Sequence, residues 1–278
     1  KIMTYHSTNG TYINEKNEQK IIDTFNYIGI SIDGIGEVHD YFRGQKGSYD
    51  KSIEAIKTIQ KKGGNAGIRF TITKETESSF YDIFTLAEEL NVNKIYISHL
   101  VYSGRGKENL EIDISKEKRR EYVNFMINKA FEYYENGKDI DIVTGNMEMD
   151  AIMLLKEFEK KYPDFVNSLK NRLKSWGGNS AGKRLGNMDW NGFVKPDPFF
   201  PMTIGNYLEK DFDKIWLDDN NELLKKLREF PRNIKGKCSS CKYIDICNGG
   251  SRSRAYAISG DLWDEDPSCY LTLEEIKG

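Results

Sequence analysis

All four cysteines of this 278-residue chain lie in its last fifth. They are Cys238, Cys241, Cys247 and Cys269, separated by two, five and twenty-one residues. Thiolates are soft ligands, and four of them satisfy either one tetrahedral zinc ion or the four irons of a [4Fe–4S] cluster. Two disulfides are the alternative, but no pattern typical of a secretory signal accompanies them. We therefore expect a metal or iron–sulfur centre.

Composition describes an ordinary globular protein, with 38% hydrophobic and 12% aromatic residues. That content can fill one large domain, or one domain with a small module. A net charge of −2 argues against a nucleic-acid or anionic-membrane partner. No apolar run approaches the ~20 residues of a membrane span. We expect a protein of the reducing cytoplasm.

The elements that would position a site alternate in the first half of the chain. Strands are expected at residues 2–7, 27–33, 66–73 and 94–98, and helices at 15–25, 48–62 and 80–90. In the second helix Ser48 is the expected cap, and Gly63 and Gly64 end it. This alternation predicts an α/β fold with a parallel sheet.

Polar residues follow successive predicted strands. Ser31 and Asp33 close one strand, and Tyr102 lies beyond another. Parallel sheets place their chemistry at the carboxyl ends of the strands. Taken singly, such residues are commonly turn or cap residues, whereas together they favour a site.

The second half is helical and then irregular. Helices are expected at 116–136, 148–161, 164–176, 211–216 and 221–230, with one more strand at 140–143. The glycine-rich segment 177–182 is either a linker or a backbone packed against a ligand. Asn191-Gly192 predicts a hairpin. Because so small a unit buries little apolar surface, a tetrathiolate centre would stabilise it.

Several segments together resemble a known family. They are S-I-D-G (31–34), H-D-Y-F-R-G (39–44), R-F-T-I-T (69–73), T-G-N-M-E-M-D (144–150), G-G-N-S-A-G (177–182) and the cysteine-containing tail 247–271. They are similar to radical S-adenosylmethionine (SAM) enzymes with a SPASM or twitch auxiliary-cluster domain. Within that group, the tail is most similar to enzymes of haem d1 synthesis and of the sirohaem-based haem route, among them the deacetylase of didecarboxysirohaem.

The resemblance implies a fold and a division of the chain. Residues 1–143 would be the C-terminal part of a partial (β/α) barrel, and residues 144–176 a helical connector. Residues 177–278 would be the auxiliary iron–sulfur domain.

The resemblance also implies cofactors. Cys238, Cys241, Cys247 and Cys269 would hold an auxiliary [4Fe–4S] cluster. Ser31, Asp33, Arg69, Val101 and Tyr102 would bind SAM, with Arg69 pairing its carboxylate. A second [4Fe–4S] cluster would cleave SAM in the intact protein, with electrons from a donor such as ferredoxin or flavodoxin. For Arg69 a surface ion pair is the alternative, and for Val101 and Tyr102 a place in the core.

One feature of the family is absent from the sequence. The C-x3-C-x2-C motif that binds the SAM-cleaving cluster does not occur among these 278 residues. We therefore expect the chain to be an inactive part of a longer protein. Ser180 and Asp197 stand where many SPASM domains have further cysteines, which leaves ligands for a single auxiliary cluster.

The implied function of the intact protein is removal of carboxylate-bearing side-chain fragments from an iron porphyrinoid. Arg43, Arg105, Arg252 and Arg254 are candidate partners for the substrate carboxylates, and solvated surface charge is the alternative for each. Two other functions remain open. One is a radical SAM maturase that modifies peptides, and the other is a non-enzymatic zinc module.

Overall fold

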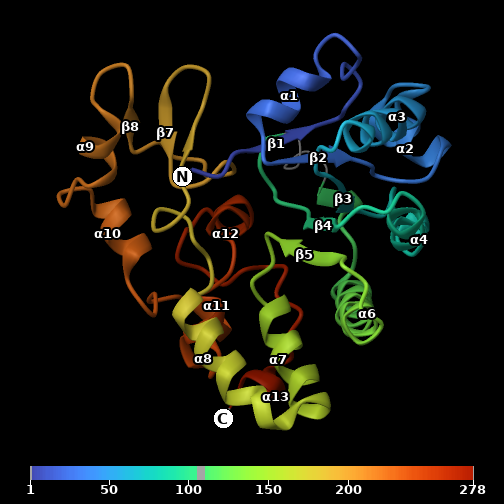
Figure 1. The fold of residues 1–278 in the computed structure, drawn as a ribbon. Coiled ribbons are helices and arrows are strands. Elements are labelled where there is room, and N and C mark those ends of the chain that lie inside the picture. Colours follow the sequence, from blue (N-terminus) through green and yellow to red (C-terminus); the bar gives the residue numbers. More distant parts are fainter. Residues whose placement is uncertain (1, 105–109, 278) are drawn as a thin grey trace. The chain divides into compact units, whose positions relative to one another are not determined.

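The computed structural model describes residues 2–104 and 110–277, and the chain separates into two compact units (Figure 1). Unit 1 comprises the described residues of Lys1–Leu100, Glu111–Ser115 and Asn124–Gly145. Unit 2 comprises those of Val101–Leu110, Lys116–Val123 and Asn146–Gly278. Arg105, one of the predicted substrate residues, lies outside the described residues.

Unit 1 is built on a five-stranded sheet in the order β1-β2-β3-β4-β5, with every neighbouring pair parallel. The strands are β1 Tyr5–Thr8, β2 Tyr27–Ser31, β3 Ala66–Ile72, β4 Lys94–His99 and β5 Asp141–Gly145. The predicted parallel α/β sheet is confirmed. Sequential strand order follows from the helix that joins each strand to the next.

Helices cover one face of this sheet (Figure 1). They are α1 Glu18–Thr24, α2 Glu37–Arg43, α3 Ser48–Lys61, α4 Asp82–Glu89 and, from Asn124 onward, the long α6 Lys116–Glu135. The covered face carries Ile28, Ile30, Ile68, Phe70 and Ile95, all buried. Burial of these β-branched and aromatic side chains is the main stabilising contribution in unit 1.

The other face of the sheet is polar and aromatic. A cavity there is lined by Tyr5, His6, Ser7, Tyr27, Arg69, Lys94, Tyr96 and Val143. Glycines make room for the large side chains of this face. A Cβ on Gly29 would lie 2.6 Å from Cδ of Arg69, and one on Gly145 would lie 1.8 Å from the Tyr96 hydroxyl. The glycines therefore leave space on this face for the bulky polar side chains of Arg69 and Tyr96.

The start of α3 corrects one expectation. Ser48 does not cap the helix with its own side chain, because the preceding residue Gly47 holds the N-cap position. The Asp40 carboxylate, from α2, accepts hydrogen bonds from the backbone N–H groups of Gly47 and Tyr49 and from the Ser48 hydroxyl. A carboxylate from a neighbouring helix therefore satisfies the free N–H groups. The predicted glycine stop is confirmed, since Gly63 has a φ of +77°.

The long segment of unit 2 that starts at Asn146 begins with α7 Asp150–Lys161 and α8 Val166–Trp176. A small antiparallel sheet follows, in the order β6-β7-β8. Its strands are β6 Asn187–Met188, β7 Phe193–Lys195 and β8 Gly205–Asn206. The remaining helices are short: α9 Phe212–Trp216, α10 Glu222–Arg228, α11 Ile244–Cys247, α12 Arg252–Ser259 and α13 Leu273–Ile276.

Helices α7 and α8, expected to form a connector, cluster with the cysteine-containing part of the chain in unit 2. Both contact α11, which carries Cys247. The hairpin predicted at Asn191-Gly192 joins β6 and β7, whereas β8 was not foreseen because two residues leave no periodic signal.

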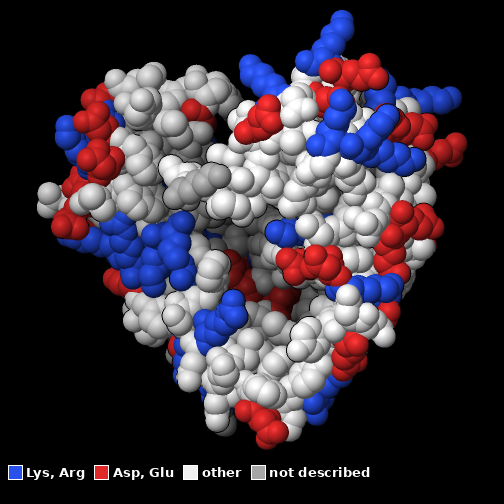
Figure 2. Space-filling view, viewed as in Figure 1, with Lys and Arg blue, Asp and Glu red and all other residues white. Residues whose placement is uncertain are grey.

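The surface charge is mixed. Figure 2 shows groups of Lys and Arg side chains interspersed with Asp and Glu, and one of the basic groups lies in the region of α10. The last turn of α10 carries Lys225, Lys226 and Arg228. In the described part of the chain, none of the helices is both long and apolar enough to cross a membrane.

Candidate metal centre

The four cysteines come from three short segments of unit 2. Cys238 lies in a 3-10 turn, Gly236–Ser240, and Cys241 follows that turn directly. Cys247 is the last residue of α11, and Cys269 lies in the loop between α12 and α13. All four are free thiols. One 3-10 turn, one short helix and one loop therefore bring together residues up to 31 positions apart in the sequence.

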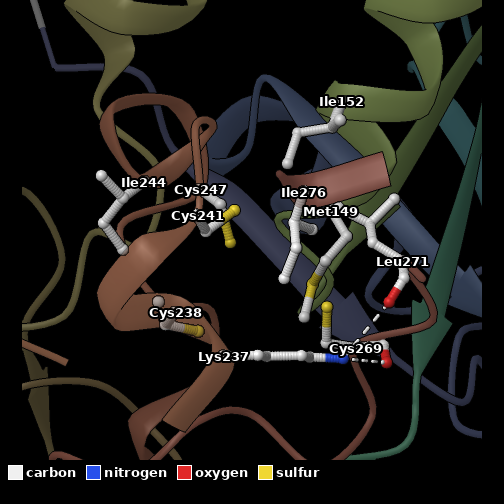
Figure 3. A pocket seen from close by; sticks show the side chains of 11 residues that line it. Met149, Ile152, Lys237, Cys238, Cys241, Ile244, Cys247, Cys269, Leu271 and Ile276 are labelled. Carbon is white, nitrogen blue, oxygen red and sulfur yellow. Dashed lines mark hydrogen bonds between the residues drawn. The ribbon is translucent and has the colours of Figure 1, made fainter. Parts of the chain in front are cut away.

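These thiols line one cavity. Its other lining residues are Met149, Ile152, Lys237, Ile244, Gly249, Leu271 and Ile276. Figure 3 shows the sulfur atoms facing a common space, with Lys237 along one side of it. Nζ of Lys237 donates hydrogen bonds to the carbonyl oxygens of Cys269 and Leu271, at 3.0 and 3.4 Å. A cationic side chain thus lies beside the thiols and anchors the segment that carries Cys269.

The spacing of the side chains bears on the kind of centre. Among the described residues, no three His, Cys, Asp or Glu side chains are placed to hold a single metal ion. A zinc site needs all its sulfurs about 2.3 Å from one point. A cluster of four irons and four sulfides is larger, and its ligands surround a volume instead. Four cysteine thiols around one cavity supply the number of ligands that either group requires.

Burial makes the free thiols weak acids. It raises the pKa of Cys238 to about 12 and that of Cys247 well above its usual value. Burial also raises the pKa of Cys241 and of Cys269, although the neighbouring Lys237 opposes it at Cys269. Neutral buried thiols are converted to thiolates when a positive metal centre binds them. The donor set therefore fits a thiolate-bound group.

The glycine-rich segment 177–182 packs against this centre and is not a linker. Gly178 has a φ of +64°, and a Cβ there would lie 2.1 Å from the carbonyl oxygen of Cys247. The backbone N–H of Asn179 donates to that same oxygen at 3.3 Å. Only glycine permits both this close approach and this backbone conformation.

Asp266 joins the two loops that precede and follow α12. Its carboxylate accepts hydrogen bonds from the backbone N–H groups of Ser251 and Ser268, at 2.7 and 3.0 Å. It also accepts two hydrogen bonds from Arg254. Ser251 lies four residues after Cys247, and Ser268 directly precedes Cys269. One buried carboxylate thus fixes the segments that present two of the thiols.

Two predicted substrate residues lie inside unit 2. Arg252 and Arg254 are both fully buried. The N–H groups of Arg252 donate to backbone carbonyl oxygens, and Arg254 is paired with Asp266. This environment favours a role inside unit 2 over contact with a substrate. The third residue, Arg43, has a partly exposed side chain in unit 1 and pairs with Asp33.

The predicted SAM-binding residues fall in both units. In unit 1, Oδ1 of the buried Asp33 accepts the Thr71 N–H at 2.8 Å, and its other oxygen pairs with Arg43. Ser31 ends β2, paired in register with Arg69 of β3. The Arg69 guanidinium carbon lies 4.1 Å above the Tyr96 ring.

In unit 2, Val101 is buried. The Tyr102 hydroxyl lies 3.0 Å from that of Ser268. Ser268 is the residue before Cys269. The predicted SAM residue Tyr102 is therefore connected to the metal centre of its own unit.

Comparison with known proteins gives the family. Pre-heme d1 synthase of Dinoroseobacter shibae is 37% identical over 273 residues, which cover 97% of this chain and 67% of that protein. Fe-coproporphyrin III synthase of Methanosarcina barkeri is 36% identical over 275 residues, covering 97% and 69%. The chain belongs to the radical SAM enzymes of haem biosynthesis.

The fold agrees with that assignment. The structure of native anSMEcpe with bound AdoMet matches this radical SAM chain with a TM-score of 0.70 and 18% identity, covering 97% of this chain and 70% of that one. No family model matches the sequence. The chain spans about two thirds of the length of the two curated relatives it resembles.

Radical SAM enzymes use SAM and iron–sulfur clusters, and the cysteine cavity of this family member has the donors for one cluster. Sequence reasoning found the four thiols from their spacing. It missed Lys237, Met149 and Asp266, which surround or support them. The position of Asp266, between Cys247 and Cys269 in a tail that also contains Arg252 and Arg254, is the signal that could have identified it.

Proposed function

We propose that this chain is the auxiliary-cluster-binding part of a radical SAM enzyme that removes a carboxylate-bearing side-chain fragment from an iron porphyrinoid. The observation that carries the proposal is the cavity lined by four thiols in a chain 37% identical to pre-heme d1 synthase. Membership of the radical SAM enzymes, which use iron–sulfur clusters, favours a cluster over a single zinc ion.

Cys238, Cys241, Cys247 and Cys269 would hold a [4Fe–4S] cluster in unit 2. The printed residues contain these four cysteines only, so they supply thiolates for one cluster. Cleavage of SAM needs a second cluster with three more cysteine ligands, and the proposal therefore assigns no SAM cleavage to these 278 residues alone. When bound, SAM and its cluster supply the radical that takes a hydrogen atom from the substrate side chain.

Unit 1 would contribute to SAM binding through Ser31 and Arg69. Among the described residues no carboxylate pairs with Arg69, and Tyr96 beneath it keeps its donor fork oriented. A planar guanidinium with free donors suits a carboxylate such as that of SAM. Asp33 would act mainly by orienting Arg43 and the end of β3, because both its oxygens already accept hydrogen bonds.

The substrate carboxylates would be bound by accessible cations. Arg43 remains a candidate, Lys183 and Arg184 are further candidates in unit 2, and Arg105, which lies outside the described residues, stays a prediction from the sequence. Nζ of Lys183 lies 4.9 Å above the Phe230 ring, and the guanidinium of Arg184 lies 4.3 Å above Trp176. Cations held over aromatic rings combine charge with a flat apolar surface, which suits a porphyrinoid with peripheral carboxylates.

Titration of the full chain with didecarboxysirohaem, followed in the Soret band under anaerobic conditions, tests the proposal. We expect a saturable spectral change that weakens in the double variant K183Q/R184Q. The exposed Lys57, replaced by Gln, serves as the control. A spectrum that does not change with the chain present, together with saturable binding of a peptide, would favour a peptide maturase instead.

A further inference from the structure

Unit 2 buries three guanidinium groups near the cysteine cavity. Arg232 is 2% exposed, and Arg252 and Arg254 are fully buried. A buried cation is costly unless charge and hydrogen bonds compensate it. The partners of the three arginines differ, and that difference carries the inference.

Arg254 is neutralised within the protein. Its Nε and Nη2 groups donate to the two carboxylate oxygens of Asp266, at 3.0 and 2.8 Å. The pair is a bidentate salt bridge with no exposed side-chain surface. Its net charge is zero, so it adds little to the field inside the cavity.

Arg252 has only neutral acceptors. Nη1 donates to the carbonyl oxygens of Leu262 and Asp264, at 2.8 and 2.6 Å. Nε and Nη2 donate to the carbonyl oxygens of Gly250 and Gly249. Within the described residues no carboxylate forms an ion pair with this guanidinium. Its charge is therefore solvated mainly by backbone dipoles, and Asp266, which is already paired with Arg254, acts on it only through space.

Arg232 has the same type of environment. Its donors reach the carbonyl oxygens of Leu227, Asn179 and Ala181 and the side-chain amide oxygen of Asn179, at 2.9 to 3.2 Å. Two carboxyl groups, those of Glu148 and Asp197, act on it only through space. Burial raises the pKa of both carboxyl groups, that of Asp197 to about 6, which weakens the compensation.

Both of these arginines, which have no directly paired carboxylate, lie beside the segment that carries Cys247. Gly249 lines the cysteine cavity, and Nη2 of Arg252 lies 3.1 Å from the position of a Cβ built on that glycine. The backbone N–H of Arg232 donates to Oδ1 of Asn248 at 2.8 Å. Both guanidiniums interact electrostatically with the Cys247 thiol, and Arg252 also with that of Cys238.

On the basis of the proposed [4Fe–4S] centre, we propose that Arg252, assisted by Arg232, supplies fixed positive charge, in addition to that of Lys237, that makes this cluster easier to reduce. Four thiolates give the centre a net negative charge, and one electron from an external reductant makes that charge more negative. Nearby buried cations stabilise the more negative state, because net charge and solvent exposure set the reduction potential of such clusters. These arginines act as positioning residues and do not touch the reacting substrate.

The test compares the full chain with Arg252→Gln, Arg232→Gln and Arg252→Lys after anaerobic reconstitution. The control is Lys235→Gln, which removes a cation whose side chain is 68% exposed. Iron and sulfide are counted first, and the cluster is then titrated with dithionite against redox mediators and followed by electron paramagnetic resonance. Iron content tests the proposed function, and the potential tests this inference.

We expect Arg252→Gln to lower the reduction equilibrium constant at least tenfold, a downward shift of about 59 mV for one electron. Arg232→Gln should shift the potential in the same direction, while Arg252→Lys and Lys235→Gln stay at the wild-type value. Cluster-loaded Arg252→Gln with an unchanged potential, or Arg252→Lys shifted as far as Arg252→Gln, would overturn the inference and leave the proposed function intact.

If Arg252→Gln does not retain a cluster, the reduction potential of Arg232→Gln tests the inference instead. A downward shift supports the charge-based role, and a wild-type potential rejects it. If the unmodified chain takes up no iron and sulfide, the proposed function fails first.

Discussion

Asp266 accepts two hydrogen bonds from Arg254, and neither side chain is exposed to solvent. Burial alone would raise the pKa of this carboxyl, but Arg254 and the backbone N–H of Ser251 hold it below its usual range. The same carboxylate fixes Ser251 and Ser268. The ion pair thus connects the segments that follow Cys247 and precede Cys269.

Replacement of Asp266 by Asn should therefore lower the free energy of unfolding strongly. It leaves the Arg254 cation buried without its partner, which costs about 3–5 kcal/mol in the free energy of unfolding. Urea unfolding followed by circular dichroism measures this loss. The matched control is Asp261→Asn, which removes a surface carboxylate paired with the exposed Lys235 and should cost at most about 1 kcal/mol. Equal losses in the two variants would show that Asp266 has no special role.

A comparison of Gly178 with Gly137 distinguishes the effect of backbone strain from the effect of close packing. Both have a φ of +64°, but a Cβ on Gly137 would meet no atom within 4 Å, whereas one on Gly178 would meet the Cys247 carbonyl. Gly137→Ala should cost about 1 kcal/mol from strain alone. Gly178→Ala should cost more and should also lower the iron retained per chain. The account of this segment is wrong if the two variants unfold alike and hold equal iron.

The raised pKa of the Asp197 carboxyl group predicts that stability depends on pH. Burial raises its pKa from 3.8 to about 6, so the folded state binds this proton more tightly than the unfolded state. The free energy of unfolding should consequently fall as the pH rises from about 4 to 6, by about 3 kcal/mol from this group. The measurement is urea unfolding at several pH values. Asp197→Asn should flatten that part of the profile, and an unchanged slope would exclude Asp197 as its source.

Arg69 should contribute to SAM affinity. Loss of a charge-assisted hydrogen bond in Arg69→Met should weaken binding by about 1.5–3 kcal/mol. Isothermal titration of SAM into the anaerobic protein gives this value. Arg172→Met, which removes an exposed arginine on α8, is the control and should bind SAM as the unmodified chain does. If Arg69→Met binds equally well, the Arg69 side chain has a structural role over Tyr96 alone.

The sequence predicted those parts of the structure that depend on local patterns. Apolar periodicity located the five parallel strands of unit 1, and the spacing of Cys238, Cys241 and Cys247 located the thiols. It could not show that Arg252 and Arg254 are fully buried, because the residue type alone does not distinguish a surface arginine from a buried one. Their partners, Asp266 and a set of backbone carbonyls, are determined by how the loops pack.

The local pattern also gave a wrong prediction at the start of α3. Ser48 is a residue type that commonly caps helices, but the Asp40 carboxylate of the preceding helix supplies the hydrogen-bond acceptor there. Tertiary contacts override local preference in such places. The grouping of α7 and α8 with the cysteine segment is likewise a property of packing that no motif records.

Iron and acid-labile sulfide per chain, counted after anaerobic reconstitution, test the central claim most directly. If Cys238, Cys241, Cys247 and Cys269 hold a [4Fe–4S] cluster, the protein should contain about four of each, with a broad absorption band near ~400 nm. Cys247→Ser should lose most of both. One zinc ion per chain without sulfide, or a folded protein with neither metal, would contradict the account.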